Sequence, residues 1–118
     1  MGQMEPNKER WATLPFIEQM ANIGSEVGRT AKWIAKDKAE MAASAYLRAL
    51  DLFDLTIEYG RIKERGRSVM LNEVCRARDY FTDAYSKSDI EKLAYLDKYF
   101  SFFALRWQSE KSCKRASY

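Results

Sequence analysis

The chain has 118 residues, of which 47% are hydrophobic and 31% charged, and its formal net charge is +3. This length fits one ordinary domain, and this balance of residues excludes a chain that is disordered throughout. The sequence contains no histidine, which excludes histidine-ligated zinc, di-iron bundles with Glu-x-x-His motifs, and nucleophiles activated by histidine.

The first apolar pattern predicts a helix that begins at Thr13, with Pro15 in its first turn, where proline is tolerated. Residues 1–12 are expected to form a flexible N-terminal segment, of which residues 1–9 are polar and contain no apolar signal region. Glycines at positions Gly24 and Gly28 fall on one side of this helix. Small residues at this spacing predict that a neighbouring helix approaches closely there.

The pattern that starts at Asp37 and ends at Glu40 is a capping box, and it predicts the start of a second helix that ends near Gly60. A basic connection, residues 61–67, follows this helix. We expect a third helix to begin at Arg67 or Ser68.

A second capping box, from Ser88 to Glu91, predicts the fourth helix, which is expected to end at Ser109. Residues 110–118 are predicted to be a basic tail that frays. No segment alternates with period two for long enough to form a strand. The sequence therefore predicts an all-α fold, an antiparallel four-helix bundle over residues 13–109.

The fourth helix carries two stripes of apolar residues on roughly opposite faces. One four-helix core covers only one of them, so the other is expected at the surface, where aromatic and leucine side chains usually mark an interface. Stacking of nucleic-acid bases on the same rings is an alternative. The predicted partner interface comprises Tyr95, Tyr99, Phe102 and Arg106 of the fourth helix with Leu47 and Leu55 of the second.

Six basic and two acidic residues lie between positions 61 and 78. Such a cluster can contact phosphates, although a solvated loop with local ion pairs is the better explanation, because no base-reading motif accompanies the charge. The predicted nucleic-acid contacts are Arg61, Lys63, Arg65, Arg67, Arg76 and Arg78.

Acidic pairs offer a further alternative. Asp51 and Asp54 on the second helix, with Asp37 and Glu40 upstream, loosely resemble the acidic-pair pattern of all-α nucleotide pyrophosphohydrolases. The resemblance implies Mg²⁺-dependent nucleotide hydrolysis, but the upstream pair already makes a good helix cap. We therefore predict no catalytic residue, no metal site and no cofactor.

Two cysteines, Cys75 and Cys113, form no disulfide framework, which favours a reducing compartment. No apolar run approaches the length of a membrane span. The expected location is the cytosol, with no membrane partner.

Residues 21–29 and 49–57, and Gly66-Arg67 followed by residues 72–81, resemble an uncharacterised group of small prokaryotic helical proteins over about positions 15–105. The resemblance implies a helical fold and a prokaryotic origin. In size and architecture alone, the chain is also similar to the accessory protein of diversity-generating retroelements. That family is a basic four-helix protein that forms a ring and binds reverse transcriptase and nucleic acid.

These observations together predict a non-enzymatic, oligomeric helical-bundle adaptor that contacts another copy or a protein partner. The alternative is a nucleic-acid-binding accessory subunit that uses the basic region between positions 61 and 78.

Overall fold

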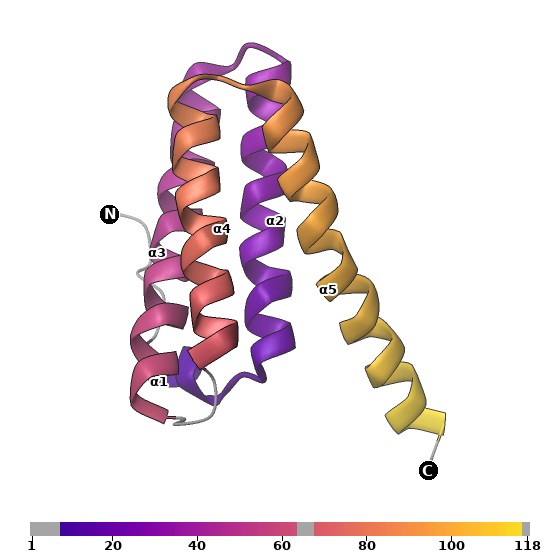
Figure 1. Ribbon diagram of the computed structural model, residues 1–118. Coiled ribbons are helices and arrows are strands. Elements are labelled where there is room, and N and C mark those ends of the chain that lie inside the picture. The colour runs from indigo at the N-terminus through magenta and orange to yellow at the C-terminus, as the bar shows by residue number, and fades with distance from the viewer. Residues whose placement is uncertain (1–7, 64–67, 117–118) are drawn as a thin grey trace, which may run out of the picture.

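The computed structural model describes residues 8–63 and 68–116, with side chains over 8–58, 71–106 and 108–109. The prediction of an all-α fold is confirmed for this part of the chain, which contains helices and no strand (Figure 1). The described residues form five helices, where the sequence predicted four. They are α1 (Lys8–Thr13), α2 (Phe16–Ala35), α3 (Ala39–Lys63), α4 (Ser68–Ser86) and α5 (Ile90–Ala116).

The additional helix, α1, lies within the segment that was predicted to be flexible. Thr13, the predicted first residue of the first long helix, is instead the last residue of α1. Pro15 is the N-cap of α2, with extended backbone angles. The reason is local, because a proline disfavours the helical conformation of the residue before it, here Leu14. The helical segment is therefore divided at this point.

Two hydrogen bonds made by Trp11 hold α1 against the bundle. The buried indole of Trp11 donates from Nε1 to Oγ1 of Thr56 on α3, at 3.0 Å. Gln19 on α2 donates from Nε2 to the carbonyl oxygen of Trp11, at 2.8 Å. The short helix is thus fixed to both α2 and α3, although six residues are too few to form a stable helix alone.

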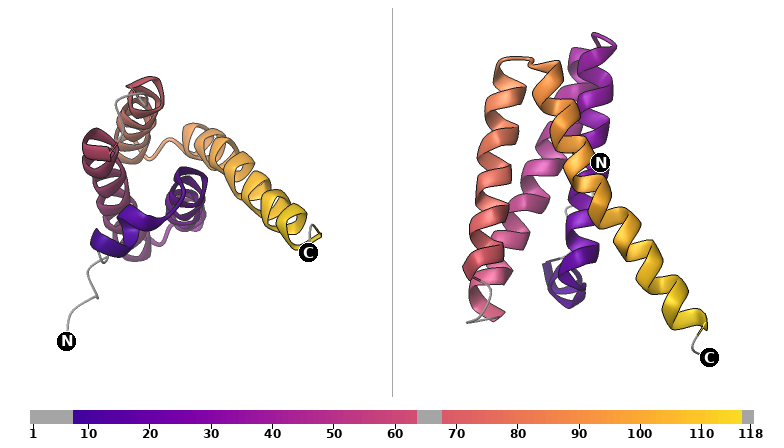
Figure 2. Two further views of the ribbon diagram at one scale, coloured as in Figure 1. Left: turned by 90° about the horizontal axis from the view of Figure 1, so that it is seen from below. Right: turned by 45° about the vertical axis from the view of Figure 1, so that its right-hand side comes forward.

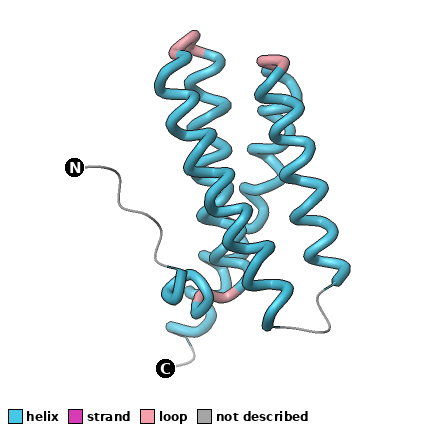
Figure 3. The backbone as a smooth tube through the Cα atoms, turned by 90° about the vertical axis from the view of Figure 1, so that its left-hand side faces the viewer, coloured by secondary structure: helices cyan, strands magenta, loops and turns pink. Residues whose placement is uncertain are grey.

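The connections from α2 to α3 and from α4 to α5 have similar backbone conformations and lie at the same end of the molecule (Figure 3). Each contains one residue with positive φ, Asp37 at 59° and Ser88 at 49°. In the first connection, the next residue, Lys38, donates its N–H to the carbonyl of Trp33 at 2.8 Å. This is the Schellman arrangement that ends a helix, and polar residues tolerate the left-handed conformation it requires.

Both predicted capping boxes are therefore wrong in detail. Asp37 ends α2 instead of opening α3, and Ser88 ends α4 instead of opening α5. The N-cap of α5 is Asp89, whose Oδ1 accepts the backbone N–H of Lys92 at 3.1 Å. Sequence spacing alone does not distinguish these roles, because the same polar residues favour helix starts and left-handed turns.

α2 packs most extensively against α3 and α5, which lie on opposite sides of it (Figure 2). The contact with α5 confirms the predicted close approach at the glycines. A Cβ atom built on Gly24 would lie 2.7 Å from Cβ of Phe100, and one on Gly28 would lie 2.8 Å from Oδ1 of Asp97. Both distances are shorter than ordinary contact, so glycine is what allows the two helices to approach each other.

Large aromatic side chains fill the core where α3, α4 and α5 meet. Phe53, Phe81 and Phe100 are all buried, and the ring centroid of Phe53 lies 5.8 Å from each of the other two. Tilted and edge-to-face contacts at this distance are favourable beyond the burial of the rings. The C-terminal part of α5 leans away from the other helices (Figures 1 and 2).

No stretch that combines the length and apolar character of a membrane span is found in the helices over 8–63 and 68–116.

Candidate functional site

The outer side of α5 carries the residues that we call the aromatic face: Tyr95, Tyr99, Phe102 and Arg106. At about 100° per residue they occupy one narrow arc of the helix. The residues on the other side, Leu93, Leu96 and Phe100, are buried in the core. Tyr95 is 65% exposed and Phe102 is 64% exposed, and Arg106 is also exposed. Two large rings therefore face solvent on a helix whose opposite side is buried in the core.

Tyr99 differs from its neighbours because it is half-buried. Its ring lies edge-on to Phe100 and Phe103, with centroids 5.2 and 5.5 Å away. Its hydroxyl donates a hydrogen bond to Oε1 of Glu73 on α4. Burial, and then this hydrogen bond to a carboxylate, raise the pKa of the Tyr99 phenol well above its usual range. Tyr99 thus remains protonated and links α5 to α4.

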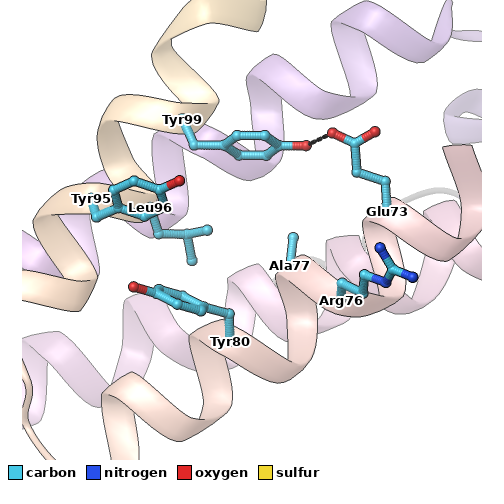
Figure 4. A pocket seen from close by; sticks show the side chains of 7 residues that line it. All are labelled: Glu73, Arg76, Ala77, Tyr80, Tyr95, Leu96 and Tyr99. Atoms are coloured by element: carbon cyan, nitrogen blue, oxygen red, sulfur yellow. Dashed lines mark hydrogen bonds between the residues drawn. The ribbon is translucent and has the colours of Figure 1, made fainter.

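Beside this link, α4 and α5 border a small pocket of about 180 Å³ that is largely open to solvent, which we call the tyrosine pocket (Figure 4). Its apolar walls include the rings of Tyr80 and Tyr95, whose centroids are 5.8 Å apart. The hydrogen bond between Tyr99 and Glu73 spans one end. The lining residues are Glu73, Arg76, Ala77, Tyr80, Tyr95, Leu96 and Tyr99.

Towards the connection between the helices, Lys92 lies beside this pocket. Its Nζ is 5.4 Å from the centroid of the Tyr80 ring and 3.1 Å from Oδ2 of Asp83. Hydrogen bonds from Lys87 and from Lys92 hold the pKa of Asp83 below its usual value. The hydrogen bond to Asp83 in turn raises the pKa of Lys92. The ion pair between Asp83 and Lys92 thus joins α4 and α5 near their connection. The hydrogen bond from Tyr99 to Glu73 joins the same two helices further along.

The two leucines that were assigned to the same interface have different environments. Leu47 is 59% exposed, but it lies on α3, across α2 from α5. Leu55 is only 7% exposed and belongs to the core. Its placement at a surface was wrong, because α1 packs on α3 at this level and Trp11 bonds to the adjacent Thr56. Neither leucine extends the aromatic face.

The predicted nucleic-acid contacts are only partly described. Arg65 and Arg67 lie outside the described residues, and Arg61 and Lys63 lie where α3 is described without side chains. On α4, Arg76 is exposed and lines the tyrosine pocket.

Arg78 faces another direction, because two residues correspond to about 200° around a helix. Its Nε donates to Oδ1 of Asp54 at 2.8 Å, and its Nη2 to Oδ2 at 3.5 Å. Arg76 and Arg78 therefore do not share one basic surface.

Asp54, which forms the ion pair with Arg78, is also one of the carboxylates of the alternative Mg²⁺ site. The structure places Asp37 at the end of α2, and Asp51 is exposed on α3. Among the described residues, no three side chains of the types His, Cys, Asp or Glu lie together as a metal-binding group. The nucleic-acid and Mg²⁺ alternatives accordingly rest on the sequence alone.

One charged cluster was not predicted from the sequence. Glu26 on α2 is buried, and its carboxylate accepts hydrogen bonds from Arg29 and from Nε of Arg48 on α3, the latter at 2.6 Å. The signal was present, since Glu26 stands within the buried stripe between Ile23 and Thr30. A carboxylate at such a position needs a cationic partner.

No protein-family model, curated protein or solved structure matches the chain.

Proposed function

We propose that the protein is a non-enzymatic, self-associating helical adaptor in which α2–α5 form an antiparallel four-helix bundle. Its contact surface is the aromatic face of α5. The observation that carries the proposal is the exposure of Tyr95 and Phe102, 65% and 64%, on a helix whose opposite side is buried. A helix with large apolar residues on both sides is typical of one that is covered on both sides.

The energy of covering these rings suggests a contact of moderate strength. An aromatic side chain buries about 200 Å², so the exposed two thirds of two rings amount to about 260 Å². At about 25 cal/mol per Å², their burial contributes about 6 kcal/mol. Association itself costs about 4–15 kcal/mol in lost freedom of motion. The rings therefore need the rest of the face, and we expect an assembly that depends on protein concentration.

A cytosolic setting is consistent with this proposal, because Cys75 is a free thiol and thiols remain reduced there.

Sedimentation equilibrium over a wide range of concentrations tests the proposal. The wild-type protein should show a mass above that of one chain, and Phe102→Ser should reduce this mass towards 13.8 kDa. Leu47→Ser is the matched control, since Leu47 is exposed to a similar degree, 59%, but lies on α3. A monomer at every concentration, or equal loss in both variants, would contradict the proposal.

A further inference from the structure

The exposed side of α2 carries a cluster of cations towards the C-terminal end of the helix. Arg29, Lys32 and Lys36 are all exposed, and Trp33 among them is half-buried. At about 100° per residue these four residues lie within one arc of about 100°, opposite the buried side of α2, and they extend over about 10 Å of helix. Arg48 of α3 lies beside them. We call these five residues the basic stripe.

The two arginines of the basic stripe share one carboxylate. Glu26 is buried, and it accepts hydrogen bonds from Arg29 and from Nε of Arg48, the latter at 2.6 Å. The side chains of Arg29 and Arg48 remain 56% and 43% exposed. A guanidinium has five N–H donors, so each arginine retains donors for a second anion. Glu26 therefore fixes the two arginines beside each other and neutralises only one of their two charges.

The two lysines of the basic stripe lie over the ring of Trp33. Nζ of Lys32 is 4.8 Å from the ring centroid, and Nζ of Lys36 is 5.7 Å from it. In the part of the chain whose side chains are described, neither ammonium forms an ion pair with a carboxylate, although Asp37 directly follows Lys36. Two like charges beside one ring repel each other, and an anion that binds between them removes this repulsion.

An aromatic ring among cations is the combination that binds single-stranded nucleic acid, because the cations contact phosphates and the ring stacks on a base. A base stacks on an aromatic side chain more strongly than an exposed ammonium binds to one. A base is therefore able to displace the lysines from Trp33, which leaves both of them free to contact phosphates. A membrane surface fits less well, because exposed apolar side chains would have to enter it, and the exposed neighbours on this side of α2 are Asn22 and Ser25.

We propose that the basic stripe binds single-stranded nucleic acid, through phosphate contacts of its four cations and stacking of one base on Trp33. This inference goes beyond the proposed function, since it uses residues of α2 and α3 and none of the aromatic face of α5. The stripe is also separate from the basic region between positions 61 and 78. Phosphate contacts and stacking do not read the edges of bases, so the binding has little sequence preference.

Fluorescence anisotropy with a labelled oligothymidylate of about 12 nucleotides tests the proposal. The wild-type protein should bind it with a dissociation constant of about 1–10 μM at low salt. Four phosphate contacts on a single strand give a slope of about −3 for the logarithm of the binding constant against that of the salt concentration. The double variant Lys32→Gln and Lys36→Gln should bind at least about tenfold more weakly and show about half this slope.

Two single variants separate stacking from charge. Trp33→Leu should weaken binding about tenfold and leave the salt slope unchanged, because it removes a stacked base and no charge. Arg76→Gln is the matched control, since it removes one charge from an exposed residue of α4 beside the tyrosine pocket, and it should weaken binding less than about twofold. Circular dichroism verifies that each variant is folded. If Trp33→Leu unfolds, the lysine double variant still carries the test.

Three results would overturn the proposal. The first is that the wild-type protein does not bind the oligonucleotide at low salt. The second is that Arg76→Gln weakens binding as much as the lysine variant does, which would assign the binding to α4. The third is tighter binding to polyglutamate, or to phosphatidylcholine vesicles that contain phosphatidylserine, than to the oligonucleotide. Phe102→Ser should still bind the oligonucleotide, so the self-association of the proposed function is tested separately.

Discussion

The contact between α2 and α5 makes a sharp prediction about two glycines in the same helix. Alanine is favoured over glycine in a helix by about 1 kcal/mol. At Gly24, however, the new Cβ would meet Cβ of Phe100 at 2.7 Å, and Phe100 is fully packed in the core. Such an added group in a filled core costs about 1–3 kcal/mol. We therefore expect Gly24→Ala to lower the free energy of unfolding by about 1 kcal/mol.

Gly28→Ala is the matched control, because it has the same intrinsic gain and a different neighbour. Its Cβ would meet Oδ1 of Asp97 at 2.8 Å. This atom is the far end of a side chain on the exposed side of the contact, so it is able to rotate away. We expect Gly28→Ala to be neutral or to stabilise the protein by up to about 1 kcal/mol.

Urea denaturation at one fixed protein concentration measures both variants. With a slope of about 1–3 kcal/mol per molar urea, a difference of 1–2 kcal/mol between them separates their midpoints by about 1 M. Concentration must be held constant because self-association also shifts apparent stability. Equal stabilisation by both substitutions would refute the reasoning, since it would mean that α5 does not lie against Gly24.

Three further substitutions test other contacts of the fold. Arg48→Met leaves the buried Glu26 with one arginine fewer and should destabilise the protein by about 1–2 kcal/mol; an unchanged urea midpoint would contradict the pairing. Trp11→Phe removes the hydrogen bond to Thr56 and should cost about 1 kcal/mol, and a midpoint unaffected by it would show that α1 is not anchored there. Partial burial raises the pKa of Asp97 above its usual value, so its ionisation in the folded state is unfavourable, and stability falls as pH rises from the unfolded pKa to the folded pKa. Asp97→Asn should accordingly stabilise the protein at pH 7 and lose this advantage below about pH 4, where the carboxyl is protonated in both states; a gain that is independent of pH would exclude desolvation as its cause.

Local patterns in the sequence were sufficient for much of the architecture. The apolar spacing predicted four long helices and an all-α fold, because a helix repeats every 3.6 residues and each face can be identified within a few turns. The spacing of Gly24 and Gly28 likewise predicted a close helix contact. The second stripe on α5 was identified for the same reason, and Tyr95 and Phe102 are indeed exposed.

Other features depended on residues that are far apart in the chain, and only the tertiary structure decided them. Leu55 looked exposed from its position on α3, but Trp11, more than forty residues earlier, packs against that level of the bundle. Tyr99 and Glu73, which are 26 residues apart, are joined across the tyrosine pocket. Periodicity states which side of a helix is apolar, but not which neighbour covers it. That choice is made by the packing of whole helices, which here leaves one aromatic face of α5 open.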